Sequence, residues 1–173
     1  MKIKYLTYIF TLIISVPSFS QYNEYEVKAQ FMERFTQYID WPEGSTINNP
    51  EIPFRIGIYG ENHFENKLDK IAEFVKIKNK KVKLKEVDFK NILDCDMLFI
   101  SQCSNEELSE IIRTVKYKGV LLVSDSEGFA NKGVHINFYN INNKINFEIN
   151  IAATHRDTFK VSSRLLKLAR IIE

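Results

Sequence analysis

The sequence lacks the residue clusters and short motifs that define the best-known enzyme classes. Its three histidines, His63, His135 and His155, are isolated, and none has metal-ligand spacing to a cysteine or to another histidine. The chain has no GxSxG nucleophile elbow, no phosphate-binding loop ending in Gly-Lys-Ser/Thr and no GxGxxG dinucleotide motif. We therefore predict a non-enzymatic protein with no catalytic residues, no bound metal and no cofactor.

Cysteine is scarce, because the chain contains only Cys95 and Cys103. The apolar run Met97–Ile100 lies between them and predicts a strand. Eight extended residue steps span about 26 Å, whereas the Cα atoms of a disulfide lie about 5.5 Å apart. We therefore expect no bond between these two cysteines, which leaves two free or intermolecular thiols.

Long apolar runs are also missing, and the longest one is at residues 5–16. This run follows two lysines and ends in a short stretch with proline and serine. It is shorter than the roughly 20 residues that span a membrane. The pattern predicts a secretory signal peptide at residues 1–20, cleaved near Ser20 and Gln21. An uncleaved membrane anchor is the alternative.

A charge excess of either sign is missing once this segment is removed. The whole chain has 24 lysines and arginines against 22 aspartates and glutamates. Residues 1–20 carry two lysines and no acid, so the remaining count is 22 (24 − 2) against 22. The sequence therefore gives no electrostatic argument for nucleic-acid binding.

The clearest structural signals lie in the C-terminal half of the chain. Four consecutive apolar residues, 120–123, predict a strand that is buried on both faces. Apolar and polar residues then alternate at 134–138 and at 145–149, on either side of Asn142 and Asn143. Because asparagine tolerates the positive φ of tight turns, this pattern predicts an antiparallel hairpin.

Helices and strands are predicted to alternate along the rest of the chain. Apolar residues spaced by about four predict helices at residues 22–39, 63–74, 104–115 and 152–172, and apolar runs predict strands at Phe54–Tyr59, Val82–Val87 and Met97–Ile100. Strand–helix–strand order is typical of parallel βαβ units. We therefore predict a single α/β domain at residues 21–173, with an open, mostly parallel sheet, flanking helices and a C-terminal antiparallel hairpin.

Small and polar residues follow three of the predicted strands, at residues 60–62, 101–102 and 124–126. Parallel sheets place their functional loops at the carboxyl ends of the strands, so these residues predict a pocket floor. Ordinary turns use the same residue types and are the alternative explanation. The candidate ligand-binding residues are Ser101, Ser124, Asp125 and Asn150.

Two groups of residues are candidates for partner binding. Phe31 and Phe35 belong to the aromatic stripe of the first predicted helix, which packs against the sheet or against a partner. Glu148, Asn150 and Arg156 flank the predicted junction between the hairpin and the last helix. An acid, an amide and a guanidinium at one edge can grip a ligand or a partner loop. A helix cap with a surface ion pair is the alternative. The candidate partner-binding residues are Phe31, Phe35, Glu148 and Arg156.

The order of sequence blocks resembles that of a known family. The blocks are EYEVKAQFMERFTQYIDWP near the start, FRIGIYG and DCDMLFIS in the middle, and GVLLVSDSEGFANKGVHINFY and INFEINIAATHRDTFKVSSRLLKLARII at the end. Together they cover nearly all of residues 21–173 and resemble the YfiR-like family of exported bacterial proteins.

This resemblance implies a regulator in the periplasm. YfiR-like proteins restrain a membrane-bound diguanylate cyclase by binding its periplasmic portion, and release of that restraint raises cyclic di-GMP and favours biofilm formation. The family is similar to open α/β folds and forms homodimers, and some members bind a small aromatic or nucleotide-like ligand. The alternative function is an exported small-molecule-binding or hydrolytic protein that uses a pocket at the carboxyl ends of the strands.

The resemblance does not extend to the disulfides of the family. Cys95 matches a family cysteine that precedes the DCDMLFIS-type strand, but the cysteine expected earlier in the chain is missing. The bridge expected around residues 128–135 is missing too. We therefore do not expect the redox control found in the family.

Overall fold

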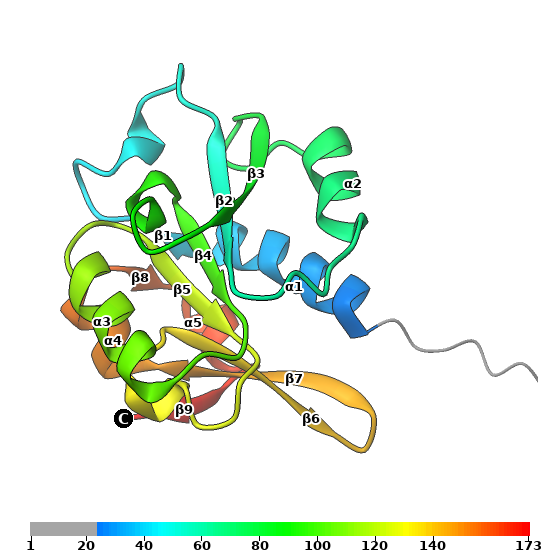
Figure 1. Cartoon of the computed structure of the whole chain (residues 1–173), viewed down its shortest axis with the longest axis vertical. Coiled ribbons are helices and arrows are strands. Elements are labelled where there is room, and N and C mark those ends of the chain that lie inside the picture. The colour runs from blue at the N-terminus through cyan, green and yellow to red at the C-terminus, as the bar shows by residue number, and fades with distance from the viewer. Residues whose placement is uncertain (1–23) are drawn as a thin grey trace, which may run out of the picture.

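A computed structural model describes residues 24–173 (Figure 1). Its centre is a seven-stranded sheet in the order β3-β2-β4-β5-β6-β7-β9. The strands are β2 (Phe54–Tyr59), β3 (Val82–Val87), β4 (Met97–Ile100), β5 (Leu121–Ser124), β6 (Ile136–Ile141), β7 (Lys144–Asn150) and β9 (Arg170–Ile172). Neighbouring strands from β3 to β6 are parallel, β6 and β7 are antiparallel, and β9 is parallel to β7. The predicted fold class, an open and mostly parallel sheet with a C-terminal antiparallel hairpin, is confirmed.

Helices cover both faces of this sheet and divide the core into two clusters. The helices α1 (Glu24–Tyr38) and α2 (Lys67–Phe74) contact each other on one face, and α3 (Asn105–Val115) packs on the other. Strand β4 contributes Phe99 to the first cluster and Leu98 to the second. Because alternate side chains enter different clusters, the strand is buried on both faces, as its continuous apolar run predicts.

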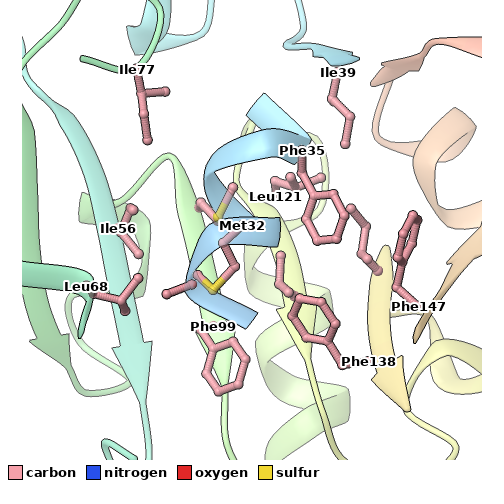
Figure 2. Packing of buried hydrophobic residues seen from close by; sticks show 14 of the residues in the cluster. Met32, Phe35, Ile39, Ile56, Leu68, Ile77, Phe99, Leu121, Phe138 and Phe147 are labelled. Atoms are coloured by element: carbon pink, nitrogen blue, oxygen red, sulfur yellow. The ribbon is translucent and has the colours of Figure 1, made fainter. Parts of the chain in front are cut away.

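Helix α1 packs its central turns directly on the hairpin (Figure 2). Met32 and Phe35 are fully buried, and the Phe35 ring lies 5.6 Å from that of Phe138 and 5.0 Å from that of Phe147. The buried face of α1 differs from the predicted aromatic stripe, because Phe31 belongs to that stripe but is only partly buried. The buried side chains of α1 are Lys28, Ala29, Met32, Phe35 and Thr36. The difference arises because this face carries a lysine and a threonine, which hydrophobic spacing does not mark.

The hairpin turn has the predicted form. Asn142 and Asn143 connect β6 to β7 with φ values of 51° and 59°. Two consecutive left-handed residues give a turn whose twist matches that of the flanking strands. At α3, Ser104 and Glu107 form a capping box, which confirms the predicted helix start. Helix α2 begins at Lys67 instead of residue 63, because Asn62 accepts a hydrogen bond from Phe64 in a preceding turn.

The prediction of one helix at residues 152–172 is wrong. The chain instead forms α4 (Ile151–Arg156), β8 (Lys160–Val161), α5 (Ser163–Leu166) and β9. Thr158 interrupts the helix with a φ of 60°, and Phe159 enters the core beside Trp41. Strand β8 pairs with β1 (Ile39–Asp40) in a small second sheet. Four short segments therefore produced the apolar spacing that suggested a single helix. The 3-10 helices η1 (Thr46–Asn48), η2 (Ile92–Asp94) and η3 (Ala130–Lys132) complete the described fold.

The remaining predictions concern thiols and the N-terminal segment. Cys95 and Cys103 are both free, as expected. The predicted signal peptide at residues 1–20 lies outside the described residues. Between residues 24 and 173, no helix is both long and hydrophobic enough to cross a lipid bilayer.

Candidate functional site

The carboxyl ends of β2, β4 and β5 border a cavity of about 570 Å³, called here the strand-end cavity. It lies where the strand order reverses, because β3 follows on one side of β2 and β4 lies on the other. Open α/β sheets bind ligands at such reversal points, and the volume suits a small molecule. The cavity is lined by Glu24, Tyr25, Lys28, His63, Gln102, Cys103, Asp125, Ser126, Glu127 and Phe129.

Asp125 connects the loop after β5 to the first turns of α1. One of its carboxylate oxygens accepts a hydrogen bond from the Tyr25 hydroxyl at 2.9 Å. The same oxygen forms an ion pair with the Lys28 ammonium group at 2.5 Å. The Lys28 side chain is only 3% exposed, and it also pairs with Glu24. Burial and the neighbouring Asp125 raise the pKa of the Tyr25 hydroxyl well above its usual value, so Tyr25 stays a neutral donor. This part of the wall is therefore a fixed network whose lysine is already neutralised.

The rest of the strand-end cavity is aromatic or weakly polar. The Tyr25 ring lies 5.3 Å from the ring of His63 and 5.1 Å from that of Phe64. Cys103 is partly exposed, and burial together with the charge of Glu107 raises the pKa of its thiol. A raised pKa keeps the sulfur protonated and makes it a poor nucleophile at neutral pH. The arrangement is suited to stacking and hydrogen bonding with a ligand.

Three of the four predicted ligand-binding residues instead hold the backbone together. The Ser101 hydroxyl donates to the Glu61 carbonyl, and the Ser124 hydroxyl donates to the Ile100 carbonyl. Asn150 accepts a hydrogen bond from the Ala153 amide and donates to the Ala130 carbonyl, so it caps α4. Asp125 is the one predicted residue that lines the strand-end cavity. Ligand binding at this edge of the sheet stays a prediction, and Asp125 is the candidate residue that borders the cavity.

The predicted grouping of Glu148 with Arg156 is wrong. Glu148 is 2% exposed and binds Arg170 through two guanidinium nitrogens, because β7 and β9 pair these two residues in register. Arg156 instead donates to Asp157 at 2.6 Å. The Arg170 pairing was missed because residue 170 was assigned to a helix, where it would not lie beside a strand.

His135, which directly precedes β6, and Asp157, which directly follows α4, form a buried pair. The Leu122 amide donates to Nδ1 of His135, so Nε2–H donates to Asp157 at 2.9 Å. Burial lowers the pKa of His135 despite the nearby carboxylate, and the ring stays neutral. Burial alone would raise the pKa of Asp157, but hydrogen bonds from His135, Arg156 and the Tyr117 amide hold it well below its usual range. Since both ring nitrogens are engaged, this pair is structural.

Two further hollows involve predicted residues. A groove of about 130 Å³, the aromatic groove, runs between α1, β7 and α5 and is lined by Phe31, Arg34, Phe35, Tyr38, Phe147, Arg164, Leu165 and Leu168. A cavity of about 450 Å³, the hairpin-face cavity, is lined by Asp125, Glu127, Gly128, residues 137–141, Glu148 and Arg170. Phe31 and Phe35 therefore share one site, and Asp125 and Glu148 share another. Within residues 24–173, no group of three or more histidine, cysteine or acidic side chains is arranged to hold a metal.

The chain was compared with known proteins and families. No curated protein matches its sequence. A family model described as YfiR/HmsC-like matches residues 25–170, from the first turn of α1 to the start of β9. The matched region includes strands β2 to β7 and nearly all residues that line the two cavities and the aromatic groove. The family is periplasmic, its members are regulators rather than enzymes, and membership suggests a role in cyclic di-GMP signalling that involves a membrane signalling protein. Because the match covers most of its length, the chain belongs to the YfiR/HmsC-like family.

Proposed function

We propose that this protein restrains a membrane-bound diguanylate cyclase by binding the part of the cyclase that lies in the periplasm. The observation that carries the proposal is the family match over residues 25–170. Regulators of this kind act by contact, so the chain needs a surface that recognises a partner segment. The aromatic groove is the surface with the most suitable chemistry.

The aromatic groove combines an apolar floor with unpaired positive charge. Phe31 is partly exposed above the buried Phe35, and Leu168 at the rim is 74% exposed. Arg34 and Arg164 also line the groove, and no carboxylate among residues 24–173 forms an ion pair with either. An amphipathic segment that carries carboxylates beside apolar side chains would satisfy both features. We therefore assign this groove to an acidic, amphipathic segment of the cyclase.

The test is a double charge reversal in the groove. Arg34→Glu with Arg164→Glu is expected to raise cyclic di-GMP in cells that contain the cyclase, because like charges would then face the acidic segment. The melting temperature should stay unchanged, since neither arginine holds an internal ion pair. The matched control is Lys81→Glu with Lys90→Glu, two exposed lysines near the opposite edge of the sheet. Full repression by the groove variant would contradict the proposal.

We also propose that a small aromatic ligand in the strand-end cavity tunes this interaction. Tyr25, His63 and Phe129 offer rings for stacking. Glu24, Asp125 and Glu127 make the lining acidic, and Lys28 is already paired. An uncharged or positively charged aromatic compound is therefore favoured over a phosphate-bearing nucleotide. Calorimetric titration with indole and with GMP distinguishes the two, and tighter binding of GMP would contradict this choice.

The same cavity supports the alternative that the protein is an exported binding or hydrolytic protein without a cyclase partner. Its position at the strand reversal favours small-molecule binding in either case. Turnover of a nucleotide by the purified protein, lost in Asp125→Asn, would support the hydrolytic alternative.

A further inference from the structure

The hairpin-face cavity has an unusual floor. Phe138 and Phe147 pack against α1, so Asn137 and Glu148, which alternate with them along β6 and β7, lie on the opposite face of the hairpin. These two residues are direct cross-strand partners. Asn137 is 1% exposed and Glu148 is 2% exposed, and both line the cavity. An amide and a carboxylate therefore lie buried at the bottom of a cavity large enough for a small molecule.

Asn137 has a hydrogen-bond acceptor that nothing in the described chain uses. Its Nδ2 donates to Glu148 at 3.2 Å and to the Phe138 carbonyl at 3.3 Å, which sets the orientation of the amide. Its Oδ1 receives no hydrogen bond from residues 24–173. Buried polar atoms almost always have a partner. The free oxygen therefore calls for a donor that the folded chain does not supply.

The charges around the cavity are mostly negative. Three carboxylates line the cavity: Asp125 is paired with Lys28, Glu148 is paired with Arg170, and Glu127 is not paired with any cation among the described residues. The Arg170 guanidinium is held by Glu148 and by the Tyr139 ring, whose centroid lies 4.0 Å away. Glu127 is exposed at the rim, and no partner within the described residues engages its carboxylate. A ligand that brings both positive charge and N–H donors would match this lining, whereas a phosphate would be repelled.

We propose that the hairpin-face cavity binds the ammonium group of a small aliphatic amine. An alkylammonium carries one positive charge and three donors, so it can donate to Oδ1 of Asn137 while its charge compensates the carboxylate of Glu127. The binding can be measured on the isolated protein. Failure there would leave the proposed regulation of a cyclase untouched, and loss of that regulation would leave amine binding untouched.

The test is calorimetric titration of the mature chain with 1,4-diaminobutane and with 1,4-butanediol, a neutral compound of the same length. We expect heat of binding for the diamine alone, together with a shift of the Asn137 side-chain amide signals in NMR spectra. Glu127→Lys should weaken diamine binding about tenfold, because it reverses the charge at the rim. Glu73→Lys makes the same charge change on an exposed part of α2 outside the cavity and should leave the affinity unchanged.

A second variant separates a binding role from a merely structural one. Arg170→Gln removes the internal cation that competes for Glu148, so it should tighten diamine binding by several-fold even as it lowers the melting temperature. Loss of a purely structural ion pair would weaken binding instead. Equal binding of diol and diamine, equal weakening by Glu127→Lys and Glu73→Lys, or weaker binding in folded Arg170→Gln would each overturn the proposal.

Discussion

The two phenylalanines of α1 should differ sharply in what they contribute to stability. Phe35 is fully buried in the core. The centroid of its ring lies 6.1, 5.6 and 5.0 Å from the ring centroids of Phe31, Phe138 and Phe147. Removing a fully buried phenylalanine ring costs about 3–5 kcal/mol, because the transfer free energy is lost and a cavity remains. Phe31 is only partly buried, so Phe31→Ala should cost roughly half as much, about 1–3 kcal/mol.

Urea unfolding followed by circular dichroism measures both values. For a chain of this size, 3–5 kcal/mol corresponds to a fall of about 6–20 °C in melting temperature. The slope of the free energy of unfolding against urea should stay the same in both variants, since neither changes the area exposed on unfolding by much. Phe31→Ala should also weaken repression of the cyclase, because its exposed edge lies in the aromatic groove. Equal destabilisation by the two substitutions would refute the packing argument, and unchanged repression by Phe31→Ala would remove this ring from the partner surface.

Four further predictions follow from the buried polar groups, the turn and the N-terminal segment. The pKa of His135 is lowered in the folded chain, so as the pH falls the unfolded chain takes up a proton before the folded chain does. The free energy of unfolding should therefore decrease as the pH falls below about 6.5, by up to about 1.4 kcal/mol per pH unit. Urea unfolding at several pH values measures this slope, and His135→Gln should flatten it. Asp125→Asn should lower the free energy of unfolding in urea by about 2–3 kcal/mol, because the buried Lys28 loses its ion pair with Asp125. Lys28→Met in the same chain should restore part of this free energy. Asn142→Val should cost about 1–2 kcal/mol because of its positive φ, whereas Asn142→Gly should cost little. N-terminal sequencing of the exported protein should begin close to Gln21, and retention of the initiator methionine would contradict the predicted cleavage.

Local patterns were sufficient for the sheet and the hairpin. The continuous apolar runs at β4 and β5 are only four residues long and are followed by small polar residues, which is typical of strands covered on both faces. The two asparagines at the turn carry the left-handed conformation that the hairpin requires. Asn150 accepts a hydrogen bond from the Ala153 amide, which is the helix cap given as the alternative to ligand binding. These features depend on neighbours in sequence, so the sequence alone reveals them.

Contacts between distant segments could not be predicted in the same way. Lys28 is buried because Asp125 and Glu24 neutralise it, and a lysine without knowledge of those neighbours is expected at the surface. Glu148 meets Arg170 only because β9 joins the sheet beside β7. That strand is three residues long, which is too short for its periodicity to be recognised. A cavity therefore lies at the predicted edge of the sheet, but three of the four candidate ligand-binding side chains bond to the backbone and only Asp125 lines it.

Helix α1 has a mechanical consequence that follows from its length and position. Its 15 residues extend for about 22 Å, and its two ends line different sites, with Tyr25 and Lys28 in the strand-end cavity and Phe31 and Arg34 in the aromatic groove. A shift of this helix along or about its axis would therefore change the lining of both sites together. A compound that favours one position of the helix would change the affinity for a partner by some factor, and the partner would change the affinity for that compound by the same factor. Under the proposed function, α1 would connect binding of a ligand in the strand-end cavity to release of the partner from the aromatic groove.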